Sequence, residues 1–278
     1  MKKLKRFLAV CLILAVACGV LTGCGNGTDG NGAKDDAADT SLEGRTKLVV
    51  GFDAEYPPYG YMDENGEYVG FDLDLAQEVC NRKGWELVKT PVDWDGKDME
   101  LNSGAIDCIW NGFTINGRED DYTWSEPYVD NSQVVIVKSD SGITNLDGLS
   151  GKVVLVQADS AALSALQSED LKSLTDSLAE LTQVPDYNSA LMTLESGAAD
   201  AVALDKVVAD YYLQEKADIF TILSEELSTE QYGIGFKKGN TALKDAVQET
   251  LKEMVKDGTF KTIAEKWDQQ DVICLTAD

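Results

Sequence analysis

The sequence predicts an α/β protein made of two lobes of similar construction. Its 278 residues are 44% apolar and 26% charged, which provides enough apolar area for two cores of ordinary size. Short valine-rich runs alternate with stretches of helical periodicity, the pattern of parallel strands joined by helices. The segments 101–107 (LNSGAID) and 194–200 (LESGAAD) agree at five of seven positions, and each joins a helix end to a strand start. The alternation therefore occurs twice, once in each lobe.

The expected elements of the first lobe follow from local patterns. Asn65-Gly66 between tyrosine-bearing flanks predicts a hairpin over 60–69. Asp72 is placed to cap a helix whose last turn is basic and whose end is marked by Gly84. The other elements expected here are a short helix at 97–103 and strands at 48–52, 87–92, 106–110 and 134–138.

The second lobe repeats this alternation. A valine-rich strand at 153–156 opens it, and a helix is expected from about Ser160. The remaining elements expected in the chain are strands at 199–204 and 233–236 and helices at 188–196, 206–215, 242–256 and 259–267. Because a helix crosses between successive strands, both lobes should contain parallel sheet.

The first 23 residues predict a signal peptide. Four bases precede an apolar run from Phe7 to Val20, about 14 residues long, and a membrane-spanning helix needs about 20. The run ends in Leu-Thr-Gly-Cys at 21–24, which resembles the lipobox of bacterial lipoproteins. That resemblance implies cleavage before Cys24, lipidation of its thiol and anchoring at the extracellular face of the cytoplasmic membrane. An ordinary secretory signal is the alternative. Residues 24–45, rich in Gly, Asp and Ala, predict a flexible tether.

Composition excludes several classes of function. With 49 acids against 24 bases the formal charge is -25, which repels phosphate backbones and argues against nucleic-acid binding. The chain has no histidine, which removes imidazole general bases and imidazole-ligated zinc. The acidic segments 72–74 and 93–96 lack the ladder of oxygen ligands of an EF-hand. These features argue against most hydrolases and against a required metal. We also expect no cofactor and no enzymatic activity.

Three cysteines remain after the predicted cleavage and lipidation: Cys80, Cys108 and Cys274. Cys80 and Cys108 lie in apolar patterns, so buried free thiols are the favoured interpretation. A disulfide between these two is the alternative, because exported chains can keep one.

The predicted binding site lies at the carboxyl ends of the strands, where ligands bind in open α/β sheets. In the first lobe these ends carry Asn111, Gly112 and Thr114, with Arg118 shortly after, and in the second lobe Asp205. Amides, a hydroxyl and a guanidinium suit a carboxylate, whereas Asp205 suits an ammonium group. A carboxylate and an ammonium close together describe an α-amino acid. The alternative is that Arg118 belongs to a charged surface run and that Asp205 only caps its helix.

Six strings carry a specific resemblance. They are VGFDAEYPPY at 50–59, GFDLDLA at 70–76, WSEPY at 124–128, GLSGKV at 148–153, LD at 204–205 and EQYGI at 230–234. Together they resemble the polar amino-acid family (family 3) of extracellular solute-binding proteins of ABC importers, over about 225 residues. The resemblance implies a type II periplasmic-binding-protein-like fold, with residues 46–136 and 233–278 as lobe 1, 137–232 as lobe 2 and two crossing hinge strands. It also implies a monomer that closes on a free amino acid and delivers it to a membrane permease.

The resemblance also assigns roles to residues. Asp205 would hold the α-ammonium, Tyr56 would lie against the stem of the ligand and Asp53 would face its distal end. The α-carboxylate would be held by Asn111, Gly112, Thr114, Arg118 and Ser160. One feature departs from the family, because Arg118 comes four residues after Thr114 and relatives usually have five.

Lys97 bears on the identity of the ligand. It occupies a position where relatives often have an apolar residue over the ligand. If it points inward, Lys97 and Asp53 offer both charges to the distal end, which favours cystine, glutamine or glutamate over an apolar amino acid. The alternative is a Lys97 that stays in solvent beside Asp95 and Asp98.

Two other functional classes share these features. A sensory lipoprotein would bind amino acids without transport. A dehydratase-like enzyme could use the same fold, with Glu55 or Asp53 as its acid, because fold alone does not determine function.

Overall fold

The structure is a computed structural model that describes residues 42–278. The predicted signal peptide, the lipid site Cys24 and the tether up to residue 41 lie outside the described residues. Within residues 42–278 no helix is both long and apolar enough to cross a membrane.

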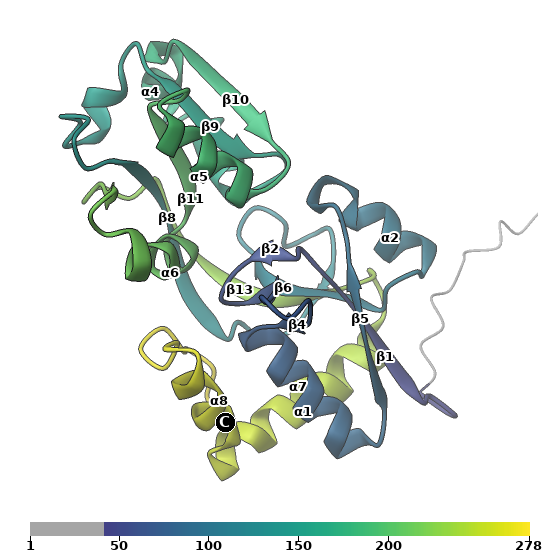
Figure 1. Cartoon of the computed structure of the whole chain (residues 1–278). Coiled ribbons are helices and arrows are strands. Elements are labelled where there is room, and N and C mark those ends of the chain that lie inside the picture. The colour runs from purple at the N-terminus through teal and green to yellow at the C-terminus, as the bar shows by residue number, and fades with distance from the viewer. Residues whose placement is uncertain (1–41) are drawn as a thin grey trace, which may run out of the picture. The chain divides into compact units, whose positions relative to one another are not determined.

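A ten-stranded sheet runs through both lobes, in the order β10-β9-β11-β8-β13-β6-β1-β5 (Figure 1). The first lobe contains β1 (Lys47–Phe52), β5 (Glu86–Pro91), β6 (Cys108–Thr114) and β7 (Thr123–Trp124). The second contains β9 (Val153–Gln157), β10 (Glu180–Val184), β11 (Ala201–Asp205) and β12 (Phe220–Ile222). β1 pairs in parallel with β5 and β6, and β9 with β10 and β11, which confirms the parallel sheet expected in each lobe.

Two long strands, β8 (Val129–Lys138) and β13 (Ser228–Phe236), connect the lobes. They pair antiparallel over residues 129–133 and 228–232. Past this overlap β8 continues beside β11, and β13 continues beside β6. Each strand therefore begins in one lobe and ends in the other, as a pair of crossing hinge strands requires. The residue numbers assigned to the two lobes remain a prediction.

Helices cover the sheet in both lobes (Figure 1). Those of the first lobe are α1 (Phe71–Lys83), α2 (Lys97–Ser103), α7 (Thr241–Asp257) and α8 (Thr259–Lys266). Those of the second are α3 (Ala161–Leu166), α4 (Lys172–Ser177), α5 (Tyr187–Ser196) and α6 (Lys206–Lys216). α2 and α5 both end at a glycine in the left-handed conformation, Gly104 and Gly197, so the repeated segments have the same local structure.

One helix start differs from the prediction. α1 begins at Phe71, and Asp72 makes no capping hydrogen bond. The carboxylate of Asp72 is instead fully buried and accepts hydrogen bonds from the Gly112 amide and the Tyr128 hydroxyl. A small antiparallel sheet, β2 (Glu55–Tyr56), β3 (Gly60–Met62) and β4 (Tyr68–Val69), contains the predicted hairpin and precedes α1.

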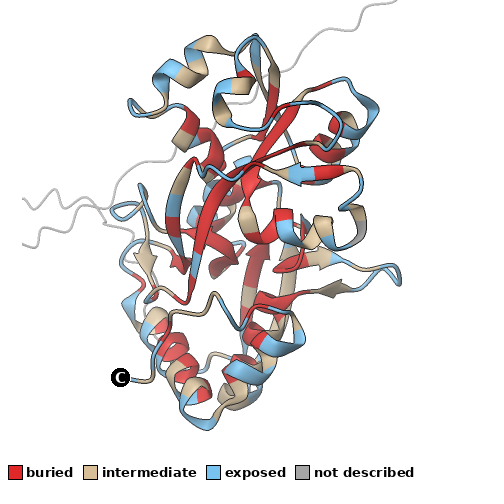
Figure 2. Cartoon of the chain, turned by 90° about the vertical axis from the view of Figure 1, so that its left-hand side faces the viewer, coloured by how far each residue is buried: buried red, intermediate tan, exposed pale blue. Residues whose placement is uncertain are grey.

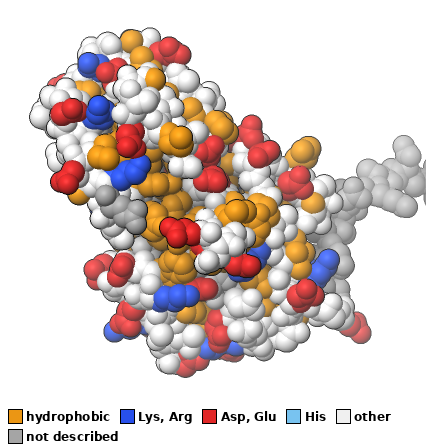
Figure 3. Space-filling view, in the orientation of Figure 1, with side chains coloured by type: hydrophobic (Ala, Val, Ile, Leu, Met, Phe, Trp, Pro, Cys, Tyr) orange, Lys and Arg blue, Asp and Glu red, His pale blue; other side chains and the backbone are white. Residues whose placement is uncertain are grey.

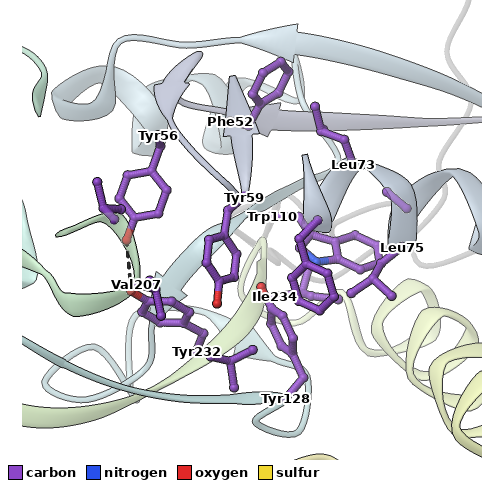
Figure 4. Packing of buried hydrophobic residues seen from close by; sticks show 14 of the residues in the cluster. Phe52, Tyr56, Tyr59, Leu73, Leu75, Trp110, Tyr128, Val207, Tyr232 and Ile234 are labelled. Carbon is purple, nitrogen blue, oxygen red and sulfur yellow. Dashed lines mark hydrogen bonds between the residues drawn. The ribbon is translucent and has the colours of Figure 1, made fainter. Parts of the chain in front are cut away.

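Burial is greatest along the sheet and under the helices (Figure 2). In the first lobe large aromatic side chains pack close to one another, among them Tyr59, Tyr128 and Tyr232 (Figure 4). Cys80 and Cys108 are buried and Cys274 is half-buried, and all three are free thiols. The interpretation of Cys80 and Cys108 as buried free thiols is thus confirmed.

Candidate functional site

A small cavity lies between the two lobes at the carboxyl ends of β6, β9 and β11. The space between its lining atoms, open solvent included, is about 230 Å³, and only about 10 Å³ of it is open to a sphere the size of a water molecule, so the two lobes lie against each other here. Six of the predicted site residues line it: Tyr56, Gly112, Thr114, Arg118, Ser160 and Asp205. The structure therefore brings together residues from both lobes that are up to 149 positions apart in the sequence, from 56 to 205.

The first-lobe wall of the cavity ends in a backbone bend at Gly112, whose φ is +55°. A Cβ at this position would lie 2.9 Å from Tyr56 Cε1 and 3.0 Å from Tyr232 Cε2. Both the dihedral angle and the two close rings require glycine here. The Gly112 N–H donates to Asp72 Oδ2 over 2.6 Å, which fixes the bend from inside the lobe.

Asp72 is a buried acid without an ion-pair partner in the described part of the chain. Burial raises its pKa to about 7, although hydrogen bonds from Tyr128 and Gly112 act in the opposite direction. Among residues 42–278, its second oxygen, Oδ1, has no partner within hydrogen-bond geometry, although the Trp110 side chain nearby also favours the charged form. This carboxyl positions the bend rather than touching the cavity.

Arg118 spans the gap between the lobes. Its Nη2 donates to the Asp159 carbonyl in the second lobe over 2.9 Å, and its guanidinium lies 5.3 Å from the centre of the Phe113 ring. Packing against the Phe113 ring and the hydrogen bond to Asp159 hold the guanidinium group beside Thr114 at the cavity. Arg118 thus lines the cavity although it follows Thr114 by four residues, which favours a place in the site over a place in a charged surface run.

Lys97 makes the second contact between the lobes on this side. Its side chain is 1% exposed, so the alternative of a solvent-exposed Lys97 is wrong. The ammonium group lies 5.1 Å from the Trp94 ring centre and forms an ion pair with the carboxylate of Asp159. Asp159 itself has φ +56°, a left-handed conformation that aspartate tolerates better than most residues. Asp159 therefore contacts two cationic side chains: its carboxylate pairs with Lys97, and its backbone carbonyl accepts a hydrogen bond from Arg118.

Asp205 lies at the opposite end of the cavity and is 4% exposed. Its Oδ1 accepts from Tyr232 over 2.6 Å and its Oδ2 accepts from Tyr187 over 2.9 Å. Amide nitrogens of Asn131 and Gln133, both on β8, also donate to Oδ1. The side chain makes no capping bond to α6, so the interpretation of Asp205 as only a helix cap is wrong. It is an acid directed into the junction of the lobes and held there by four neutral donors.

Tyr56 connects the two ends of the cavity. Its hydroxyl lies 3.0 Å from that of Tyr232, which in turn donates to Asp205 (Figure 4). Its ring also packs 5.9 Å from that of Tyr187, across the lobe junction.

Asp53 lies beside this cavity rather than in its lining, and a group of acids surrounds it. Its Oδ2 accepts from Gln157 Nε2 of the second lobe over 2.6 Å. Burial, together with the nearby charges of Asp186 and Glu55, raises the pKa of Asp53 to about 6, against hydrogen bonds that favour the charged form. Such a group of acids repels a second anion and suits a cationic or hydrogen-bond-donating group.

Two other predicted residues also lie outside the lining. Asn111 is buried and its Oδ1 accepts from the Asp53 backbone amide over 2.9 Å, so it supports β1 instead of the cavity. Lys97 is bound to Asp159, and no bond joins it to Asp53 in the described residues.

Sequence reasoning missed four residues that line the cavity: Trp94, Gln157, Ala161 and Tyr187. Gln157 is the last residue of β9, and Tyr187 begins the helix after β10. The rule that ligands bind beyond strand ends could have found both. Trp94 follows β5 in a 3-10 turn (Trp94–Gly96), and an aromatic residue there gave no local signal to separate a cavity wall from a core.

Comparison with known proteins identifies the family. The family model for bacterial extracellular solute-binding proteins, family 3, matches residues 48–270. The chain belongs to this family. It is 30% identical over 241 residues to the L-cystine-binding protein TcyJ of Escherichia coli, covering 86% of this chain and 88% of the relative. It is also 30% identical over 275 residues to the L-cystine-binding protein TcyA of Bacillus subtilis, covering 96% and 98%.

A solved structure supports the fold. The substrate-binding protein of an ABC uptake transporter from Streptococcus pneumoniae, with bound histidine, superposes with a TM-score of 0.79 at 33% identity. The match covers 82% of this chain and 95% of that one. The type II periplasmic-binding-protein fold predicted from the sequence is thereby confirmed.

Proposed function

We propose that this solute-binding protein binds a free amino acid with a polar side chain and delivers it to the permease of an ABC importer. The supporting observation is that one cavity is lined by Arg118 from the first lobe and Asp205 from the second. A ligand with a carboxylate at one end and an ammonium group at the other is complementary to this pair. The relatives that bind cystine and histidine are consistent with an amino-acid ligand.

The α-carboxylate of the ligand is assigned to Arg118, Thr114 and the backbone at Gly112, with Ser160 contributing from the second lobe. The α-ammonium is assigned to Asp205, and Tyr56 is assigned to the stem. Because these groups come from two lobes, both ends of the ligand are bonded only when the lobes are together. The ligand therefore favours the closed state, and closure signals to the permease that the protein is loaded.

The distal group of the ligand is assigned to Asp53. The acids around Asp53 disfavour the second carboxylate of glutamate, whereas the second ammonium group of cystine or the amide of glutamine can donate to it. We therefore favour cystine, then glutamine. Lys97 contributes to this site by closing it with Asp159.

A thermal-shift series tests amino-acid binding. Protein beginning at Ser41 is unfolded, refolded to remove bound ligand, and melted with each common amino acid and with cystine. At a thousand times Kd the stabilisation is about 4 kcal/mol, which corresponds to roughly 8 to 16 °C for this size. A shift confined to one or two polar amino acids supports the proposal. No shift with any of them, from protein shown to be folded by circular dichroism, overturns it.

Transport and anchoring need separate tests. We place the protein at the outer face of the cytoplasmic membrane through a lipid on Cys24. Cys24→Ser should release it into the medium, and loss of the gene should abolish uptake of the labelled ligand. Unchanged uptake would favour the sensory alternative. Recovery of the bound ligand chemically unchanged after long incubation would exclude the dehydratase alternative.

A further inference from the structure

A second acid, Glu230, shares two amide donors with Asp205 but lies outside the lining of the cavity, and the proposed function gives it no role. Glu230 is on hinge strand β13, and its side chain is 5% exposed. Its Oε1 accepts from Asn131 Nδ2 over 2.7 Å and from Gln133 Nε2 over 2.7 Å. The same two nitrogens donate to Asp205 Oδ1 over 3.1 and 2.6 Å. Two amide groups thus bridge two buried carboxyl groups.

This arrangement lacks a cation. Within residues 42–278 neither Asp205 nor Glu230 forms an ion pair with a lysine or arginine, and the other groups that face Glu230 are the hydroxyls of Tyr56, Tyr187 and Tyr232. Arg118 shares an adjoining cavity with Glu230 without an ion-pair contact. Two carboxylates so close together and so deeply buried cannot both be charged without a large cost. Either one of them is protonated or a cation is bound between the lobes.

The hydrogen bonds indicate which acid carries the proton. Asp205 accepts from two tyrosine hydroxyls in addition to the two amides, so its negative charge is well solvated by donors. Among residues 42–278, the donors to the carboxyl group of Glu230 are the two shared amides, and its other close polar neighbour is the carboxyl group of Asp205. Burial and the neighbouring charge of Asp205 accordingly raise the pKa of Glu230 to about 8, against the amide bonds that lower it.

We propose that Glu230 holds one proton beside Asp205 in the ligand-free protein and that the ammonium group of the ligand displaces this proton to solvent. The inference rests on the proposed function, because it takes the ligand to be an amino acid bound at Asp205. The ammonium supplies the positive charge that the proton supplied before, so Glu230 becomes a second anion of the ammonium site. No bond other than the O–H bond of Glu230 breaks, and the buffer accepts the proton.

Release of this proton on binding fixes the direction in which ligand affinity changes with pH. Below pH 8 the free protein holds the proton on Glu230, and the bound protein has lost it over part of that range. Affinity should then rise with pH, by up to tenfold per unit, between about 6 and 7.5, and level off above about 8. At pH 7 most of one proton should be released for each ligand bound.

Calorimetry tests this directly. The amino acid found by thermal shift is titrated into stripped protein at pH 7 in two buffers with different ionisation enthalpies. Glu230→Gln keeps the shape and the acceptor of the protonated acid, so it should still bind, but it should lose the proton release that Glu230 contributes and show a flatter pH profile between about 6 and 7.5. Glu226→Gln is the matched control, because this acid is close in sequence but exposed and bonded to Ser132. It should behave as the unmodified protein.

The outcomes are distinguishable. Binding with no difference between the buffers, or with the same proton release in Glu230→Gln, overturns this inference and leaves the proposed function intact. Failure of every amino acid to bind overturns both. Asp53 and Asp72 also have raised pKa values, of about 6 and about 7, and the comparison with Glu230→Gln separates their contributions from that of Glu230.

Discussion

Lys97 and Asp159 form an ion pair, and substituting one of them should weaken ligand binding more than substituting the other. Lys97 is 1% exposed, whereas the side chain of Asp159 is 49% exposed. Asp159→Asn keeps the left-handed backbone, which asparagine also tolerates, but removes the carboxylate that is in direct contact with the buried ammonium group. The only other carboxylate near it is that of Asp98, at 4.0 Å among the described residues. Lys97→Met removes the buried charge and leaves Asp159 in contact with water.

The size of each loss in affinity depends on whether the charge left without its partner is buried or in contact with water. Removing one partner of a fully buried pair costs about 3 to 5 kcal/mol. Half of this pair is hydrated, so about 2 kcal/mol is a reasonable cost for Asp159→Asn, equivalent to about thirty-fold in affinity. That cost falls on the closed state, since an opened cleft lets water reach Lys97. Lys97→Met should weaken binding by less than about fivefold, because an exposed carboxylate loses little on losing its partner. The double variant should resemble Lys97→Met.

Ligand titrations of the four proteins measure this cycle, with thermal melts of the ligand-free forms to verify folding. Asp176→Asn is a suitable control, because Asp176 pairs with Lys172 on the surface, with side chains 64% and 60% exposed. A larger loss from Lys97→Met than from Asp159→Asn would refute the reasoning. It would mean that Lys97 binds the ligand directly.

Three further predictions concern the first-lobe wall. Gly112→Ala places a side chain at a left-handed φ, which costs about 1 to 2 kcal/mol, and brings its Cβ within 3.1 Å of two rings, which costs about 1 to 3 kcal/mol. The melting temperature of this variant should therefore fall by roughly 5 to 15 °C. Arg118→Ala should weaken binding more than tenfold while Arg118→Lys retains part of it, and an unchanged Kd for the alanine variant would contradict the assignment. Asp72 has a pKa raised from 3.8 to about 7, so its charged form is disfavoured by folding and the free energy of unfolding should decrease as pH rises from about 4 to 7. Asp72→Asn should reduce that decrease, and an identical pH profile for variant and unmodified protein would exclude Asp72 as its source.

Much of the fold was accessible from the sequence because it depends on local patterns. Apolar runs, helix ends at glycine and one repeated segment were enough to predict two α/β lobes with parallel strands. The strand-end rule then selected Gly112, Thr114 and Asp205, since the carboxyl ends of parallel strands meet at one edge. The start of α1 was misplaced because the burial of Asp72 depends on Gly112, which is 40 residues away.

The sequence by itself determined the construction of each lobe, the family and which group of the ligand, carboxylate or ammonium, each lobe is predicted to bind. Only the tertiary structure decided which other side chains surround these groups. Lys97 and Asp159 are 62 residues apart and lie in different lobes, so no periodicity relates them. The pairing of Glu230 with Asp205 likewise depends on hinge strand β8, whose Asn131 and Gln133 amides donate to both acids. Contacts across a hinge are set by how the lobes close, and short-range sequence patterns carry no information about that geometry.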